Sequence, residues 1–182
     1  MKPSWSLITL ILALGAASAA LAAGWPSNVT PVAIQKGKTV TVAGKLETGQ
    51  VLPDLSWASR SSVACFPATQ NLRFNGKHVL YATQLPPRSI LTVKVVPDDP
   101  SVDLSIYAYS IGVNNFAVVP DLGSCVSCEA EHKWDRPKRG KTQDHTRAVK
   151  LNAVTNPYNV VVGVAGANGR NTGSYTLEFT LE

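Results

Sequence analysis

The sequence predicts an all-β protein, an antiparallel two-sheet β-sandwich or jelly roll of seven to nine strands. Several segments alternate apolar and polar side chains with a period of two, which is typical of strands with one buried face. Glycine, proline, asparagine and aspartate separate these segments at short intervals. No window carries a helical stripe, so short antiparallel strands in two packed sheets are the expected architecture.

Residues 1–22 have the composition of an export signal. Lys2 gives a basic start, residues 7–14 are apolar, and small residues follow. The apolar run is short and Gly24-Trp25-Pro26 comes directly after it, so we expect cleavage and no stable membrane span in the mature chain. The protein is therefore expected to be secreted, or to reside in the periplasm or cell envelope.

The remaining chain has the size of one domain. Removing the signal leaves roughly 160 residues, enough to bury a sizeable core without help from metals. Residues 23–38 contain Pro26 and Pro31 and show little periodicity, which predicts an extended lead-in. Residues 39–182 are then expected to form a single β-sandwich domain.

The strands are predicted from alternation or from β-branched content. The segment 174–182 is the clearest, because Tyr175, Leu177, Phe179 and Leu181 lie on one face. The preceding run, 158–165, is apolar on both faces, which indicates a central strand. A glycine-rich loop joins these two segments, so a closing hairpin is expected. The other predicted strands are 39–46, 78–83, 91–95, 103–109 and 149–153.

The alternation stops between residues 121 and 146. This stretch is polar, charged and rich in turn residues, which predicts a loop. Its length exceeds the usual connection in a compact domain, and long loops often carry function. We therefore expect the part from Cys125 to His145 to contact a partner.

Three segments of the second half resemble the bacterial pre-peptidase C-terminal domain. They are Leu85-Pro86-Pro87-Arg88-Ser89-Ile90-Leu91-Thr92-Val93, Asp103-Leu104-Ser105-Ile106-Tyr107-Ala108-Tyr109, and the run from Val160 through Gly173-Ser174-Tyr175-Thr176-Leu177. The resemblance covers roughly residues 75–182. It implies a jelly-roll-like β-sandwich, usually appended to secreted peptidases, and no catalytic residue. The chain departs from the family in carrying no attached enzyme and in the excursion at 125–145.

Three cysteines in an exported chain allow one internal disulfide. A bridge from Cys65 to Cys125 or Cys128 closes a loop of about 60 residues, worth roughly 4 kcal/mol in the chain-entropy model. A ring between Cys125 and Cys128 is worth about 2 kcal/mol. The sequence favours the long bridge and leaves its second cysteine open.

Two metal sites are weaker alternatives. Cys125, Cys128 and His132 offer thiolate and imidazole ligands to zinc, but a structural zinc site usually shows a second ligand pair at similar spacing. Calcium is the other alternative, but a calcium loop needs alternating ligands and a glycine that are missing here. The calcium candidates are Asp98, Asp99 and Asp103. No cofactor is expected otherwise.

Basic and aromatic side chains supply the candidate binding residues. The chain has a formal charge of +5, and seven of its seventeen lysines and arginines lie between residues 133 and 150. Four acids dilute this cluster, so a nucleic-acid partner is not expected. On the predicted strand 103–109, two tyrosines face outward and offer rings to a sugar. The candidates are Lys133, Trp134, Arg136, Lys138, Arg139, Tyr107 and Tyr109.

The sequence indicates no enzyme. It contains neither a nucleophile elbow nor a metal-binding HExxH pattern. The favoured function is a non-catalytic binding or accessory module for an extracellular or envelope protein or polysaccharide. One alternative is a metal-binding or redox protein using Cys65, Cys125, Cys128 and His132, and another is a structural envelope component.

Overall fold

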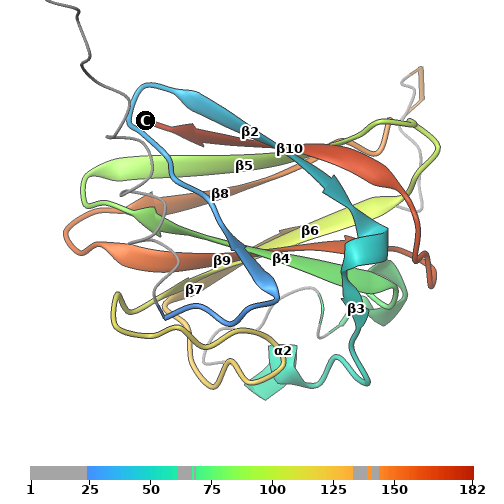
Figure 1. The fold of residues 1–182 in the computed structure, drawn as a ribbon, viewed down its shortest axis with the longest axis horizontal. Coiled ribbons are helices and arrows are strands. Elements are labelled where there is room, and N and C mark those ends of the chain that lie inside the picture. Colours follow the sequence, from blue (N-terminus) through green and yellow to red (C-terminus); the bar gives the residue numbers. More distant parts are fainter. Residues whose placement is uncertain (1–23, 61–66, 68, 133–138, 141–143) are drawn as a thin grey trace, which may run out of the picture.

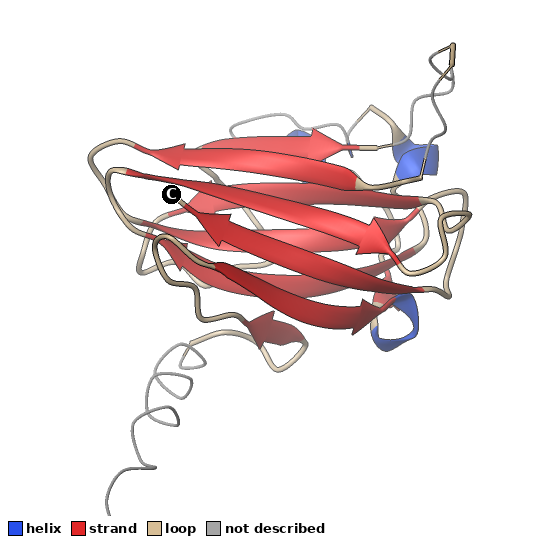
Figure 2. Ribbon diagram, turned by 90° about the horizontal axis from the view of Figure 1, so that it is seen from above, coloured by secondary structure: helices blue, strands red, loops and turns tan. Residues whose placement is uncertain are grey.

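The computed structural model describes residues 24–60, 67, 69–132, 139–140 and 144–182. The predicted signal, 1–22, lies outside the described residues. Within them, ten strands form two sheets packed face to face, so the predicted all-β sandwich is confirmed (Figures 1 and 2). Two of the strands are only two or three residues long.

Sheet A has the order β1-β4-β9-β6-β7, with β3 also paired to β4, and sheet B has the order β2-β10-β5-β8. All pairs are antiparallel except β1 with β4. The strands are β1 (Val29–Pro31), β2 (Thr39–Lys45), β3 (Gln50–Val51), β4 (Lys77–Leu85), β5 (Ser89–Pro97), β6 (Leu104–Ile111), β7 (Ser127–Glu131), β8 (Arg147–Ala153), β9 (Tyr158–Gly166) and β10 (Ser174–Leu181). The helices are short: η1 (Leu46–Thr48), α2 (Trp57–Arg60) and η3 (Asn71–Arg73).

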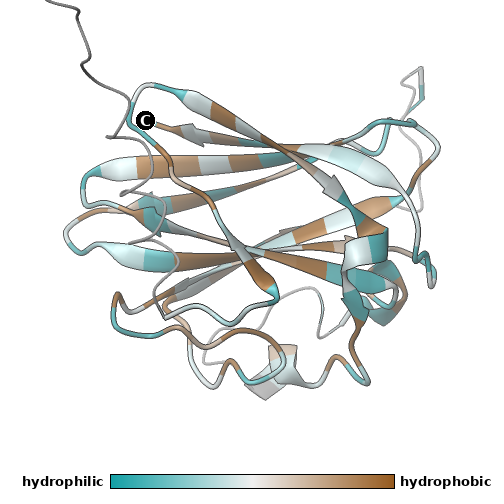
Figure 3. Cartoon of the chain, in the orientation of Figure 1, coloured by the Kyte–Doolittle hydropathy of each residue, from teal (hydrophilic) through white to brown (hydrophobic). Residues whose placement is uncertain are grey.

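Sheet B buries one face, as its alternating sequence predicts. In β10, Tyr175, Leu177, Phe179 and Leu181 are buried in the core between the sheets, while the residues between them are half-buried on the outer face. Strands β5 and β8 alternate in the same way. The bands of apolar and polar residues along these strands are visible in Figure 3. A period of two gives one core-facing and one solvent-facing row.

Sheet A buries both faces, because loops and α2 cover its outer side (Figure 1). The inner face belongs to the core between the sheets. The outer face packs against Trp57, Phe74 and Leu122, and we call this second cluster the outer core. Strand β6 is consequently buried at every residue. This explains why the segment 158–165 is apolar on both faces.

One glycine is required by the packing of the outer core. Gly163 in β9 lies directly opposite Tyr107 in β6. A Cβ atom at Gly163 would overlap the ring of Tyr107, which is fully buried. The bare backbone of Gly163 therefore provides the space that the Tyr107 ring occupies.

The predicted closing hairpin is wrong. Strand β9 pairs with β4 and β6 in sheet A, whereas β10 pairs with β2 and β5 in sheet B. The glycine-rich loop crosses between the sheets, and its positive φ angles at Asn168, Gly169 and Gly173 turn the chain. The alternation of apolar and polar residues indicates that two segments are strands, but it does not show with which other strands they pair.

Three segments without predicted strands contain them, and the shortest of these strands is β3. The predicted loop 121–146 includes β7, which pairs with β6 at the edge of sheet A. The extended lead-in, 23–38, includes β1, which pairs in parallel with β4. Strand β7 is half-buried and carries two glutamates, and β1 has three residues and ends in proline. Both therefore lack the long apolar alternation from which strands are predicted.

Candidate functional site: a groove on the open side of the sandwich

The two long sides of the sandwich differ in how the sheets meet. On one side β7 contacts β8, and a carboxylate oxygen of Glu131 accepts a hydrogen bond from the backbone N–H of Ala148 at 2.6 Å. On the other side β1 and β2 form the sheet edges, with a cavity between them. We call these the closed side and the open side. The open side offers access to the space between the sheets.

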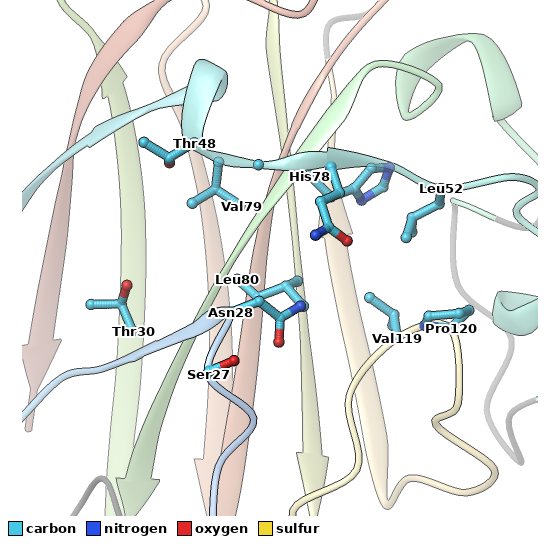
Figure 4. A pocket seen from close by; sticks show the side chains of 12 residues that line it. Ser27, Asn28, Thr30, Thr48, Leu52, His78, Val79, Leu80, Val119 and Pro120 are labelled. Atoms are coloured by element: carbon cyan, nitrogen blue, oxygen red, sulfur yellow. The ribbon is translucent and has the colours of Figure 1, made fainter.

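The groove on the open side consists of two adjoining cavities. One, of about 460 Å³, lies between β2 and the edge of sheet A. The other, of about 270 Å³, lies where β1, β3 and β4 meet (Figure 4). Thr30, Thr48 and Val79 line both cavities, so the two join along these residues. We refer to them together as the open-side groove.

The pairing of β4 creates the smaller cavity. Strand β3 pairs with Lys77 and His78, and β1 pairs with the stretch from Leu80 to Ala82. The two short strands approach β4 from different directions and leave a hollow beside Val79 (Figure 4). The break between β3 and β1 along the edge of β4 therefore forms the smaller cavity.

The lining mixes hydrogen-bonding and apolar side chains. A small number of polar groups on a largely preformed apolar wall is the usual composition of a ligand site. Besides Tyr81 and Tyr175, the polar side chains are Ser27, Asn28, Thr30, Lys45, Thr48, Gln50, His78, Asp98 and Ser174. The apolar ones are Val42, Ala43, Leu52, Val79, Leu80, Val119 and Pro120.

A tyrosine pair links the two sheets beside the groove. The hydroxyls of Tyr81 in β4 and Tyr175 in β10 are 3.0 Å apart and hydrogen-bonded. Gly44 lies opposite Tyr175, and a Cβ atom there would overlap both side chains. Burial raises the pKa of both phenols, so they remain neutral hydroxyls. The pair is a fixed part of the groove wall.

His78 forms another fixed part. Its Nε2 lies 2.6 Å from the carbonyl oxygen of Phe74, and its Nδ1 lies 3.0 Å from the hydroxyl of Tyr107. A carbonyl oxygen only accepts, so Nε2–H donates to it and Nδ1 accepts from Tyr107. Burial lowers the pKa of His78 to about 4, although the bond to Phe74 opposes this shift. The imidazole is therefore neutral at physiological pH.

Of the basic candidates and Trp134, the structure describes only Arg139, which does not line this groove. Lys133, Trp134, Arg136 and Lys138 lie outside the described residues. Arg139 is exposed, as expected for a solvated loop. The prediction that these residues contact a ligand stays a prediction.

Tyr107 and Tyr109 do not form the predicted exposed surface. Both are fully buried in the outer core, where they contact the ring of Trp57. The alternation places them correctly on the outer face of sheet A. The covering loops, which the alternation does not reveal, then bury them. They cannot meet a ligand at the surface.

The cysteine region lies against the outer core. Cys125 is buried, Cys128 is half-buried in β7, and both pack against this cluster. His132 is buried, and its ring packs nearly perpendicular to that of Phe74, with the ring centroids 6.1 Å apart. Cys65 lies outside the described residues, so the long disulfide stays a prediction. Among the described residues, no three Cys, His, Asp or Glu side chains gather as a metal-ligand set.

The three aspartates proposed for calcium have different surroundings. Asp99 accepts a hydrogen bond from the backbone N–H of Ser101, which lowers its pKa. Asp103 is buried, 3.0 Å from Nδ1 of His145 and 3.8 Å from the guanidinium of Arg73. Asp98 is exposed and lines the groove. Asp99 therefore stabilises a turn, Asp103 belongs to a buried ionic cluster, and Asp98 forms part of the groove wall.

The strand pairing and the groove define a two-sheet β-sandwich with one open side. No protein-family model matches the chain, and no curated protein matches its sequence. No helix in the described ranges is long and apolar enough to cross a membrane.

Two solved structures are similar to the chain. The periplasmic inhibitor of g-type lysozyme from Aeromonas hydrophila has 11% identity and a TM-score of 0.43, over 85% of this chain and 96% of that one. The pre-peptidase C-terminal domain of a Bacillus anthracis collagenase has 11% identity and a TM-score of 0.37, over 86% and 97%. The second is a domain of the family that the sequence resembles. No residue role is transferred from either structure.

Proposed function

We propose that the mature chain is an exported, non-catalytic binding module that holds an extended protein or polysaccharide segment in the open-side groove. The observation that carries this proposal is the asymmetry of the sandwich. The closed side is bridged by Glu131, whereas the open side presents two joined cavities with polar and apolar walls. Two joined cavities that extend from β2 to β3 suit a chain-like ligand better than a compact metabolite.

The buried ionisable groups of the groove support binding without catalysis. Both ring nitrogens of His78 are occupied by Phe74 and Tyr107, and its low pKa makes it a weak base. The hydroxyls of Tyr81 and Tyr175 satisfy each other and have raised pKa values. A general base needs a pKa near the working pH and a ring nitrogen within reach of the substrate. An activated nucleophile needs a lowered pKa or a neighbouring base.

The scaffold supports a rigid site. The groove walls belong to β1, β2, β4 and η1, which are fixed by strand pairing and by two apolar cores. A preformed site avoids the entropic cost of ordering loops when a ligand binds. The module therefore needs no conformational change to present the groove.

Arrays of matrix proteins and envelope glycans, probed with residues 23–182, test this function. Thr30 is exposed and lines both cavities, so Thr30→Trp fills the groove. Lys150→Trp, on the exposed face of β8, is the matched control. We expect array ligands to be retained by the wild type and by Lys150→Trp and lost by Thr30→Trp. Equal retention by all three would place binding elsewhere, and no retention by the wild type would contradict the function.

A further inference from the structure

Strand β2 is an edge strand that lacks the usual protection. It runs for seven residues in regular register with β10, and in the described part of the chain it pairs with no other strand. The stretch from Thr39 to Gly44 contains neither charge nor proline. Proteins normally guard such edges with charges, prolines, bulges or covering loops, because a bare edge can pair with another chain.

The hydrogen-bond pattern shows which backbone groups face outward. Leu46 donates its N–H to Gly173, and Lys38 accepts from Leu181. Because bonded pairs alternate along an antiparallel ladder, the even-numbered residues of β2 bond to β10. Thr39, Thr41, Ala43 and Lys45 therefore direct their N–H and C=O groups away from β10. These four residues form a hydrogen-bonding row along the open side.

The groove lies next to this row. Val42, Ala43 and Gly44 line its larger cavity. The side chains of Val40 and Val42 are half-buried and pack against the core between the sheets. An added strand would place its own inward side chains beside these valines, in the cavity that reaches Tyr81 and Tyr175. Backbone pairing and side-chain pockets are thus available together, which is the pattern of strand addition.

Charge distinguishes a foreign strand from a second copy. Lys38 and Lys45 flank the uncharged stretch at its two ends. Pairing two copies of β2 would bring four lysines together with no acidic residue in the paired stretches, whereas acidic ends on a partner would oppose Lys38 and Lys45 and favour binding. The acids nearby are Glu47, which accepts from the Gly173 N–H, Asp98 in the groove, and Glu178 of β10, which lies opposite Thr41 and forms an ion pair with Lys94.

We propose that β2 binds an extended segment of a partner protein by antiparallel strand addition, the segment having alternating apolar side chains and acidic residues at its ends. This inference rests on the proposed function and specifies its ligand. The partner backbone bonds to Thr39, Thr41, Ala43 and Lys45. Its apolar side chains enter the open-side groove, and its acidic ends lie beside Lys38 and Lys45.

Calorimetric titration with a designed peptide tests the proposal. The probe is the blocked octapeptide Glu-Leu-Thr-Val-Thr-Val-Thr-Glu, whose leucine and valines oppose Gly44, Val42 and Val40. We expect saturable binding with a Kd below about 1 mM. The same peptide with lysine at both ends should bind about three- to tenfold more weakly.

Variants of β2 show whether the outward backbone is used. Thr41→Pro removes an N–H that β10 does not need, so the fold is retained, and we expect about tenfold weaker binding. Reversing both Lys38 and Lys45 to Glu should invert the preference between the two peptides. Lys150→Glu on β8 should leave both affinities unchanged.

Three results would overturn the inference: no binding of the acidic peptide, full affinity in Thr41→Pro, or a dimer in sedimentation that Thr41→Pro dissociates. Such a dimer would show that β2 pairs with β2 of a second copy of the chain. If array ligands are retained through the groove while the peptide fails to bind, the proposed function stands and strand addition is wrong.

Discussion

At the scale of single residues, His78 makes the stability of the protein depend on pH. Its folded pKa of about 4 lies below the unfolded value of about 6.5. The unfolded chain therefore binds the proton more readily, so this contribution is present above pH 6.5 and is lost as pH falls toward 4. Protonation at Nδ1 would also remove the acceptor for the Tyr107 hydroxyl.

We predict that the free energy of unfolding of the wild type falls by about 1–1.5 kcal/mol more than that of His78→Gln between pH 7.5 and 5.5. Glutamine does not titrate, and the other histidines contribute equally to both proteins. Urea unfolding at a series of pH values measures the difference. Parallel curves for the two proteins would show that His78 titrates normally when folded.

The Gly163 position gives a second prediction at this scale. Because a Cβ atom would overlap the buried Tyr107 ring, Gly163→Ala should lower the free energy of unfolding by about 1–3 kcal/mol. Gly112→Ala is the matched control, since its Cβ would meet no atom within 4 Å. Chemical denaturation of both variants tests the prediction, and an equal, small effect would contradict the packing described for the outer core.

At the scale of elements, the sequence predicts strands better than it predicts their partners. The seven predicted strands all form, because each combines apolar side chains that pack against a core with turn residues at its ends. Strands β1, β3 and β7 were not predicted, since they are short or carry charges on a half-buried edge. The placement of β9 and β10 in different sheets depends on long-range packing, which alternation does not encode.

The open edge of β2 yields a stability prediction independent of any ligand. Thr41→Pro removes an outward N–H and should cost less than about 1 kcal/mol. Val42→Pro removes a ladder bond to β10 and should cost about 3 kcal/mol or more. Thermal unfolding of the two variants compares them directly. A larger cost for Thr41→Pro would reverse the assignment of outward and inward backbone groups.

At the scale of the whole molecule, two apolar cores and one open side define the protein. The outer core was not foreseen from the sequence, because the segments that cover sheet A show no regular pattern. The groove was missed for a related reason: its walls come from residues 27–52, 78–81, 98, 119–120 and 174–175, which are far apart in the sequence. The one local signal was Gly44, a glycine within a strand, which often marks a close approach by another group.

The predicted disulfide affects the stability of the whole molecule, because it joins cysteines about 60 residues apart in the sequence. We expect the oxidised mature chain to be two hydrogens lighter than the reduced chain, with Cys65 joined to Cys125 or Cys128. Reduction should lower the free energy of unfolding by about 4 kcal/mol. Intact-mass measurement and peptide mapping establish the pairing. A mapped bridge between Cys125 and Cys128 would replace the long loop by a small ring with about half that effect.

Site-resolved amide hydrogen exchange, with and without the acidic octapeptide, tests whether a partner strand adds to the open side of the sandwich. We expect the amides of Thr41 and Ala43 to exchange quickly in the unliganded chain and to become protected on binding, while those of Val40 and Val42 are already protected by β10. Protection confined to the closed side or to the surroundings of Arg139, with no change in β2, would contradict strand addition.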